Sequence, residues 1–263
     1  MSHYTVAVFT VDECQSVDDL LAPYDEGISM DPYVDMTREE FIRHRRERMQ
    51  ETYDNCYVPW KTNPETYEKT ANPAHIDYLK SLPERMQWTD DQIYEDAIQG
   101  YDAEDVDEDG SILSRYNPYS KWDWYEVGGR WRDMLMLKSE ESDQHQFCDA
   151  AYAADIDFDA MRKKQLSNIR PYQEAMKNSF YKEEYLRELY PSEAEYHQRM
   201  TAFSTYAVIT PDGEWHAPGD MGWFGMSSET IGAKRDWEDE YYDEFIRPAI
   251  ENGWYLTIVD CHI

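Results

Sequence analysis

Residues 254–260 read WYLTIVD and lie almost at the end of the 263-residue chain. Residues 3–11, HYTVAVFTV, have the same character at the other end, and residues 205–210 read TYAVIT. Segments this rich in β-branched and aromatic residues are typical of strands. Pro211-Asp212-Gly213 has the composition of a turn, so we expect residues 214–216 to return as a hairpin partner. Strands at both ends of the chain are therefore expected to meet in one sheet.

Helical patterns occupy most of the chain between these strands. Thr37 with Glu40, Thr89 with Gln92 and Ser192 with Glu195 form capping boxes that predict helix starts. The fold class expected is α+β, with an antiparallel or mixed sheet built from the N- and C-terminal strands and a large helical insertion. We expect one domain, residues 1–263, with the sheet from about 1–12, 120–138 and 203–263 and helical insertions at about 36–100 and 156–200.

Composition limits the classes of partner. The formal net charge is -30, from 55 acidic and 25 basic residues. Such a charge repels nucleic acid and anionic membranes, so direct nucleic-acid binding and membrane association are not expected. The same charge can attract a basic protein, imitate DNA, or serve solubility, and solubility is the simplest of these explanations.

The chain shows no export or membrane signal. No apolar run approaches the roughly 18 residues that span a bilayer, and residues 1–10 lack the features of a signal peptide. The four cysteines (Cys14, Cys56, Cys148 and Cys261) are far apart, without the spacing of a zinc site or redox motif. We therefore expect free thiols, no metal and no cofactor.

The most distinctive segment is residues 120–132, SKWDWYEVGGRWR. Indole and phenol rings can stack on a base or sugar, paired glycines permit close backbone approach, and the guanidinium of an arginine suits phosphate. An anionic, nucleotide-like ligand is one interpretation, and a tight turn with core tryptophans is the other. The candidate ligand-binding residues here are Trp122, Trp124, Tyr125, Gly128, Gly129, Arg130 and Trp131.

A second candidate region is residues 211–230, PDGEWHAPGDMGWFGMSSET. Its glycines and Pro218 indicate a shaped loop. His216, Trp223 and Ser227 are candidate ligand contacts, although the serine could instead cap the following helix. His216 with Asp220 is a conceivable acid–base pair.

Three other features suggest weaker alternatives. Residues 105–110, DVDEDG, resemble the start of a calcium loop but lack its final glutamate. The arginines at 43–48 are expected mainly to pair with the protein's own carboxylates. Asp260 with His262 could form a catalytic pair, whereas Cys261 and His262 should point to opposite faces of a strand. No catalytic residue is assigned from the sequence.

Several segments together resemble an uncharacterised protein family of tailed bacteriophages. They are Met1–Val6, Leu21–Glu26, the central SKWDWYEVGGRW and the terminal WYLTIVDCHI, in the same order. The resemblance implies a phage accessory protein, with an anti-defence role and a location in the cytoplasm of the bacterial host. It implies no catalytic residues.

The sequence is compatible with three functions. The first is binding and sequestration of a small anionic, nucleotide-like ligand. The second is an acidic DNA mimic or decoy that binds and inhibits a basic host defence protein. The third is a small hydrolase that uses His216 with Asp220, or His262 with Asp260. The oligomeric state is left open.

Overall fold

The computed structural model describes residues 2–139, 146–177, 181–222 and 225–263. It divides into two compact units, one formed by residues 1–28 and 117–263 and the other by residues 29–116. The expected helical insertion at 36–100 forms most of the second unit. Cooperative unfolding of the whole chain as a single domain stays a prediction.

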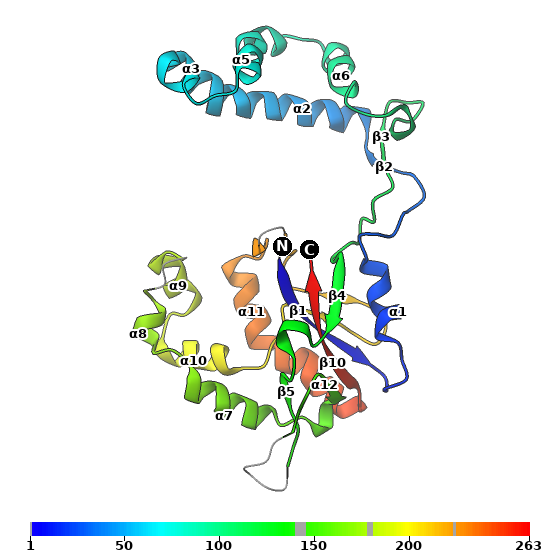
Figure 1. The fold of residues 1–263 in the computed structure, drawn as a ribbon, viewed down its shortest axis with the longest axis vertical. Helices are drawn as coiled ribbons and strands as arrows, with labels where there is room; N and C mark the ends of the chain where they lie inside the picture. The colour runs from blue at the N-terminus through cyan, green and yellow to red at the C-terminus, as the bar shows by residue number, and fades with distance from the viewer. Residues whose placement is uncertain (1, 140–145, 178–180, 223–224) are drawn as a thin grey trace. The chain divides into compact units, whose positions relative to one another are not determined.

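The first unit is built on the expected mixed sheet, which confirms the α+β class (Figure 1). The strand order is β4-β10-β1-β8-β9, and β7 also pairs with β10. The terminal strands β1 and β10 are antiparallel neighbours over their whole length, whereas β1 and β8 are parallel. The strands are β1 (His3–Thr10), β4 (Trp124–Val127), β7 (Ala150–Tyr152), β8 (Ala207–Ile209), β9 (Trp215–His216) and β10 (Tyr255–His262).

Side chains along the central strands alternate between the two faces of the sheet, and both faces are buried. Ala7, Phe9 and Ile258 belong to one hydrophobic cluster, which α11 and α12 cover with Tyr241 and Ala249. Val6, Val8 and Val259 belong to the other cluster, together with Leu21 of α1 and Trp122. The helices concerned are α1 (Val17–Leu21), α11 (Ile231–Tyr241) and α12 (Arg247–Asn252).

The helical segment before the last strand contains a widened turn. Thr230 caps α11, so the alternative in which Ser227 caps this helix is wrong. A π-helical turn, η7 (Tyr242–Ile246), joins α11 to α12 just before Pro248. Proline lacks the N–H that a helix needs, and a widened turn accommodates that loss.

The remaining elements of the first unit surround the sheet. Among the described residues of the segment expected to be helical, about 156–200, the structure has four α-helices, and Ser192 caps the last of them as predicted. The elements are α7 (Phe158–Asn168), α8 (Tyr172–Ala175), α9 (Glu183–Leu189), α10 (Glu193–Thr201), the small pair β5 (Leu135–Met136) with β6 (Phe147–Cys148), and the short helices η1 (Ala22–Tyr24), η4 (Gly129–Trp131) and η5 (Ala153–Asp155).

The second unit is mainly helical. Thr37 and Thr89 form the two predicted capping boxes. Ile76, Leu79 and Leu82 form the buried centre of its hydrophobic cluster. Its elements are β2 (Tyr33–Met36), α2 (Arg38–Thr52), η2 (Tyr53–Tyr57), α3 (Val58–Thr62), α4 (Pro64–Glu68), α5 (Pro73–Arg85), α6 (Asp90–Ile98), η3 (Ala103–Asp105) and β3 (Ile112–Ser114), with β2 and β3 antiparallel.

Candidate functional site

The aromatic side chains of residues 120–132, the central aromatic motif, are divided between the two faces of the sheet. Trp122 is buried, and its indole N–H donates to the carbonyl of Leu21 at 3.1 Å. Tyr125 packs edge-on against Trp122, with ring centroids 5.0 Å apart, and its hydroxyl donates to Asp18. Burial, and next the hydrogen bond to Asp18, raise the pKa of Tyr125. Both rings therefore serve the hydrophobic core, whereas Trp124 lies on the opposite face and is 49% exposed.

The two glycines of the motif bring the backbone against carboxylates of the same chain. Gly128 and Gly129 have φ angles of +71° and +49°. A Cβ on Gly128 would lie 2.5 Å from Oδ2 of Asp149, and one on Gly129 would lie 2.4 Å from Cβ of Asp260. The amide N–H of Arg130 donates to Oδ2 of Asp260 at 3.0 Å. The close approach expected from the paired glycines is present, but it serves internal carboxylates.

The last residues of the segment 120–132 have different surroundings. Arg130 has an exposed side chain, and no ion pair joins it to another described residue. Trp131 packs against the cluster under α11 and α12. Asp133 follows with φ of +58°, and its N–H donates to Asp149 at 2.5 Å. A non-glycine residue in this conformation stores strain, which is a feature of many functional loops.

Two histidine–aspartate pairs lie side by side at one end of the sheet. Nδ1 of His3 lies 2.9 Å from Oδ1 of Asp260, and Nδ1 of His262 lies 2.5 Å from Oδ1 of Asp123. The two imidazole centroids are 5.0 Å apart, and the ring of Trp124 lies 6.4 and 6.5 Å from them. The expected pairing of His262 with Asp260 is therefore wrong, because each forms a pair with a different residue.

Sequence reasoning missed His3 and Asp123 as members of this cluster. The antiparallel register places His3 opposite His262, and His262 opposite Trp124. The signal was present in the sequence, since a histidine stands near the outer end of each terminal strand. Using it required the strand register, which the sequence did not establish.

The second candidate region does not join this cluster. His216 lies on β9, at the opposite edge of the sheet from β4. Its Nε2 lies 3.3 Å from the hydroxyl of Thr210, and its ring packs against Phe245. Asp220 binds Lys121 at 2.6 Å, so the expected His216–Asp220 pair is not formed.

The other two candidates from residues 211–230, Ser227 and Trp223, give no further site. Ser227 forms an isolated bridge with Met221. Trp223 lies outside the described residues.

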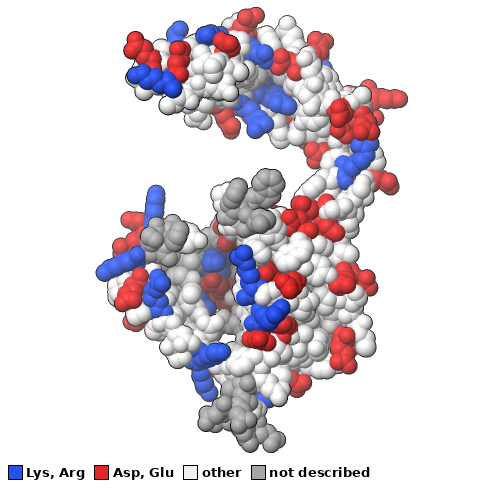
Figure 2. All heavy atoms as spheres, in the orientation of Figure 1, with Lys and Arg blue, Asp and Glu red and all other residues white. Residues whose placement is uncertain are grey.

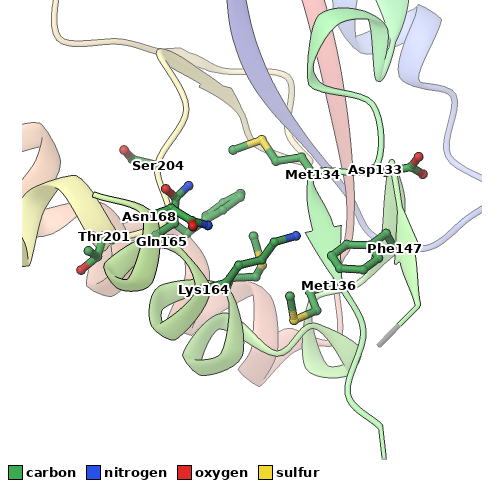
Figure 3. A pocket seen from close by; sticks show the side chains of 12 residues that line it. Asp133, Met134, Met136, Phe147, Lys164, Gln165, Asn168, Thr201 and Ser204 are labelled. Carbon is green, nitrogen blue, oxygen red and sulfur yellow. The ribbon is translucent and has the colours of Figure 1, made fainter. Parts of the chain in front are cut away.

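A pocket of about 360 Å³ begins where the central motif ends (Figure 3). Its apolar wall consists of Met134, Met136, Phe147, Met161 and Phe203. Figure 3 shows Lys164 extending from α7 toward Phe147, and its Nζ lies 4.3 Å from the centre of that ring. No acidic side chain of the described residues pairs with Lys164. Its polar lining also includes Gln165, Asn168, Thr201 and Ser204.

Two of the four arginines at 43–48 pair with carboxylates as predicted, whereas Arg45 lies over the ring of Phe41. Arg46 binds Asp90 at 2.6 Å, and Arg43 lies 3.9 Å from Glu47. Both carboxylates belong to the same unit as the arginines. Internal neutralisation therefore accounts for these two cations.

Acidic side chains are spread over the visible surface. On the face in Figure 2 they occur on both units, in places next to Lys or Arg, and do not form one continuous stripe. The decoy hypothesis stays a prediction, without support from this face. In the acidic run at 105–110, Asp105 pairs with Arg115.

A metal-binding cluster and a membrane-spanning helix are both absent from the described part of the chain. No group of three or more His, Cys, Asp or Glu side chains there is arranged to hold a metal ion. None of the helices that the structure describes is both long and apolar enough to cross a membrane.

Comparison of the chain with models of protein families, with curated proteins and with solved structures finds no match. The candidate site is therefore interpreted from its own chemistry.

Proposed function

We propose that this protein binds and sequesters a small anionic, nucleotide-like ligand in the pocket of Lys164. The observation that carries the proposal is the place of Lys164, an exposed lysine that lines a pocket and lies against an aromatic ring, without an acidic partner among the described residues. Of the 25 Lys and Arg residues, 13 form an ion pair with a carboxylate among the described residues, and Lys164 is one of those that do not. A cation left without one can stabilise an anion.

The remainder of the pocket suits the other part of such a ligand. Phe147 and Phe203 offer flat apolar surface, and the methionines adapt to irregular shapes. Gln165 and Asn168 carry both donors and acceptors, which the edge of a heterocyclic base requires. Ligand pockets commonly combine an apolar wall with a few polar groups that fix orientation.

Arg130 supplies a second exposed cation in the same unit. It belongs to the loop that ends at Asp133, which lines the pocket. Together with the sequence resemblance to a phage family, these features support an accessory protein that counters bacterial defence by removing a nucleotide signal.

A thermal-shift screen against linear and cyclic nucleotides tests the proposal. A nucleotide at about 100 times its Kd should stabilise the fold by about 2.7 kcal/mol, which raises Tm by several degrees at this chain length. Lys164→Met should abolish the shift. Lys163→Met, which changes a neighbouring exposed lysine outside the pocket, should retain it.

Two results would contradict the assignment. The absence of any shift with all nucleotides would refute nucleotide binding. A shift that Arg130→Ala abolishes and Lys164→Met leaves intact would move the site from the pocket to the end of the sheet.

A further inference from the structure

The helical unit, residues 29–116, contains a pocket whose charge is opposite to that of the chain. The pocket has a volume of about 540 Å³, and its charged lining consists of Arg45, Arg48, Arg85 and a single carboxylate, Asp96. The whole chain has 55 acidic residues against 25 basic ones, so an average stretch of its surface is acidic. An excess of positive charge around a recess focuses the local field and raises the local concentration of anions.

Two of these arginines have no acidic partner. Arg45 and Arg48 lie three residues apart on α2, so their side chains lie on the same side of that helix. The guanidinium of Arg45 lies 5.0 Å from the ring centroid of Phe41, and no carboxylate among the described residues forms an ion pair with Arg45 or Arg48. Asp96 is already bound by Arg85 at 2.7 Å. The pocket therefore keeps two guanidinium charges that its own lining does not neutralise.

The third arginine is held in place as part of the wall. Nε of Arg85 donates to the hydroxyl of Ser81 at 3.1 Å, and its Nη1 donates to Asp96. Its guanidinium also lies 4.6 Å from the ring centroid of Trp88, whose carbonyl accepts a hydrogen bond from Arg46 at 3.0 Å. These contacts leave Nη2 of Arg85 without an acceptor among the described residues. Arg85 therefore offers a positioned donor to the pocket.

Tyr78 adds a neutral donor beside the arginines. Burial raises the pKa of Tyr78, and the nearby charges of Arg85 and Arg45 oppose part of that rise. Because the pKa is raised overall, the phenol keeps its proton at neutral pH and can donate it in a hydrogen bond. The rest of the lining includes apolar surface from Met49, Trp88, Ile93 and Ala97.

We propose that this pocket binds the phosphate group of a small phosphate monoester. The inference does not depend on the pocket of Lys164, which belongs to the other unit. A phosphate monoester carries a charge of about −1.5 to −2 at pH 7 and three acceptor oxygens. Two unpaired guanidinium groups match that charge, and the planar fork of an arginine binds phosphate oxygens in pairs. A carboxylate has only one charge and two oxygens, so it would leave part of this donor set unused.

The apolar part of the pocket favours a compact ring on the phosphate. Tyr78 and Trp88 offer aromatic surface, and Met49 adapts to irregular shapes. A volume of about 540 Å³ lies within the range of pockets that bind small molecules. The ligand class is therefore a phosphate monoester of a small cyclic molecule.

Titration calorimetry of the full chain with three probes tests the proposal. Phenyl phosphate should bind most tightly, inorganic phosphate more weakly because it lacks the ring, and benzoate most weakly because it lacks the phosphate. Arg45→Gln and Arg48→Gln should each raise the Kd for phenyl phosphate about tenfold or more. Arg43→Gln is the matched control. It removes one positive charge from the same helix outside the pocket lining, so the Kd should be nearly unchanged.

Thermal denaturation of each variant shows whether its fold is intact. Arg45 packs over Phe41, so Arg45→Gln could unfold the unit. Arg48 is exposed, so Arg48→Gln should leave the fold intact and decides the test in that case.

Lys164→Met separates this site from the one in the proposed function. Binding that Arg48→Gln weakens and Lys164→Met retains would support the inference. Binding that Lys164→Met abolishes and both arginine variants retain would overturn it and leave the proposed function standing. Equal weakening by Arg43→Gln and Arg48→Gln would reveal a general charge effect and also overturn it. The absence of saturable binding of phenyl phosphate, or equal binding of benzoate, would refute the phosphate assignment.

Discussion

Gly129→Ala is the substitution whose effect the structure specifies most closely. At φ of +49° an alanine is strained by about 1–2 kcal/mol relative to glycine. Its Cβ would also lie 2.4 Å from Cβ and 2.6 Å from Oδ2 of Asp260. Relieving that overlap by displacing the buried aspartate costs about 1–3 kcal/mol more. We expect a total loss of about 2–5 kcal/mol in the free energy of unfolding.

Gly253→Ala is the matched control. Gly253 has φ of +68°, but no atom lies within 4 Å of the position its Cβ would take. Only the backbone strain should remain, about 1–2 kcal/mol. Urea denaturation followed by far-UV circular dichroism measures both variants. Equal losses in the two variants would refute the conclusion that the loop packs tightly onto Asp260.

Three further predictions follow from buried polar groups. Arg199→Met breaks a two-bond ion pair between a buried guanidinium and the carboxylate of Asp239, which is 39% exposed. It should cost about 1–3 kcal/mol in urea denaturation, against about 0.3–0.5 kcal/mol for Arg187→Met at an exposed pair, and equal costs would contradict this. Burial raises the pKa of Glu238, so ionisation of this carboxyl opposes folding as pH rises. Glu238→Gln should therefore raise the free energy of unfolding by about 1 kcal/mol at pH 7. The gain should vanish below the ordinary pKa range of a glutamate, where the wild-type carboxyl is protonated in both states. A gain that persists in acid would argue against this cause. Burial also raises the pKa of the Cys261 thiol, so a thiol reagent should modify exposed Cys14 in the native protein and Cys261 only after unfolding.

Local patterns predicted the elements of the fold well. The strands at both ends and the hairpin partner at residues 214–216 are present, because β-branched and aromatic runs next to turn residues have few alternatives. The capping boxes at Thr37 and Thr89 mark true helix starts, since their hydrogen bonds join residues three apart. The division into two compact units was not predicted, because it depends on how contacts distribute in space.

The candidate site was predictable only in part. The sequence grouped Trp124, Gly129 and Arg130 with Trp122 as candidate ligand contacts. The structure places Trp122 in the hydrophobic cluster on the opposite face of the sheet from Trp124. His3, whose ring lies beside that of Trp124, is 121 residues away from Trp124 in the sequence. A pair so far apart becomes visible only when the strand register is known.

The sequence by itself determined the α+β class, the helix starts, and the acidity that disfavours long nucleic acids as ligands. These properties depend on composition and on residues a few positions apart. Only the tertiary structure decided that Asp260 pairs with His3, that His262 pairs with Asp123, and that the paired glycines accommodate internal carboxylates. The reason is that a one-residue change of register between β1 and β10 would place His3 and Asp260 on opposite faces of the sheet, and local sequence does not fix that register.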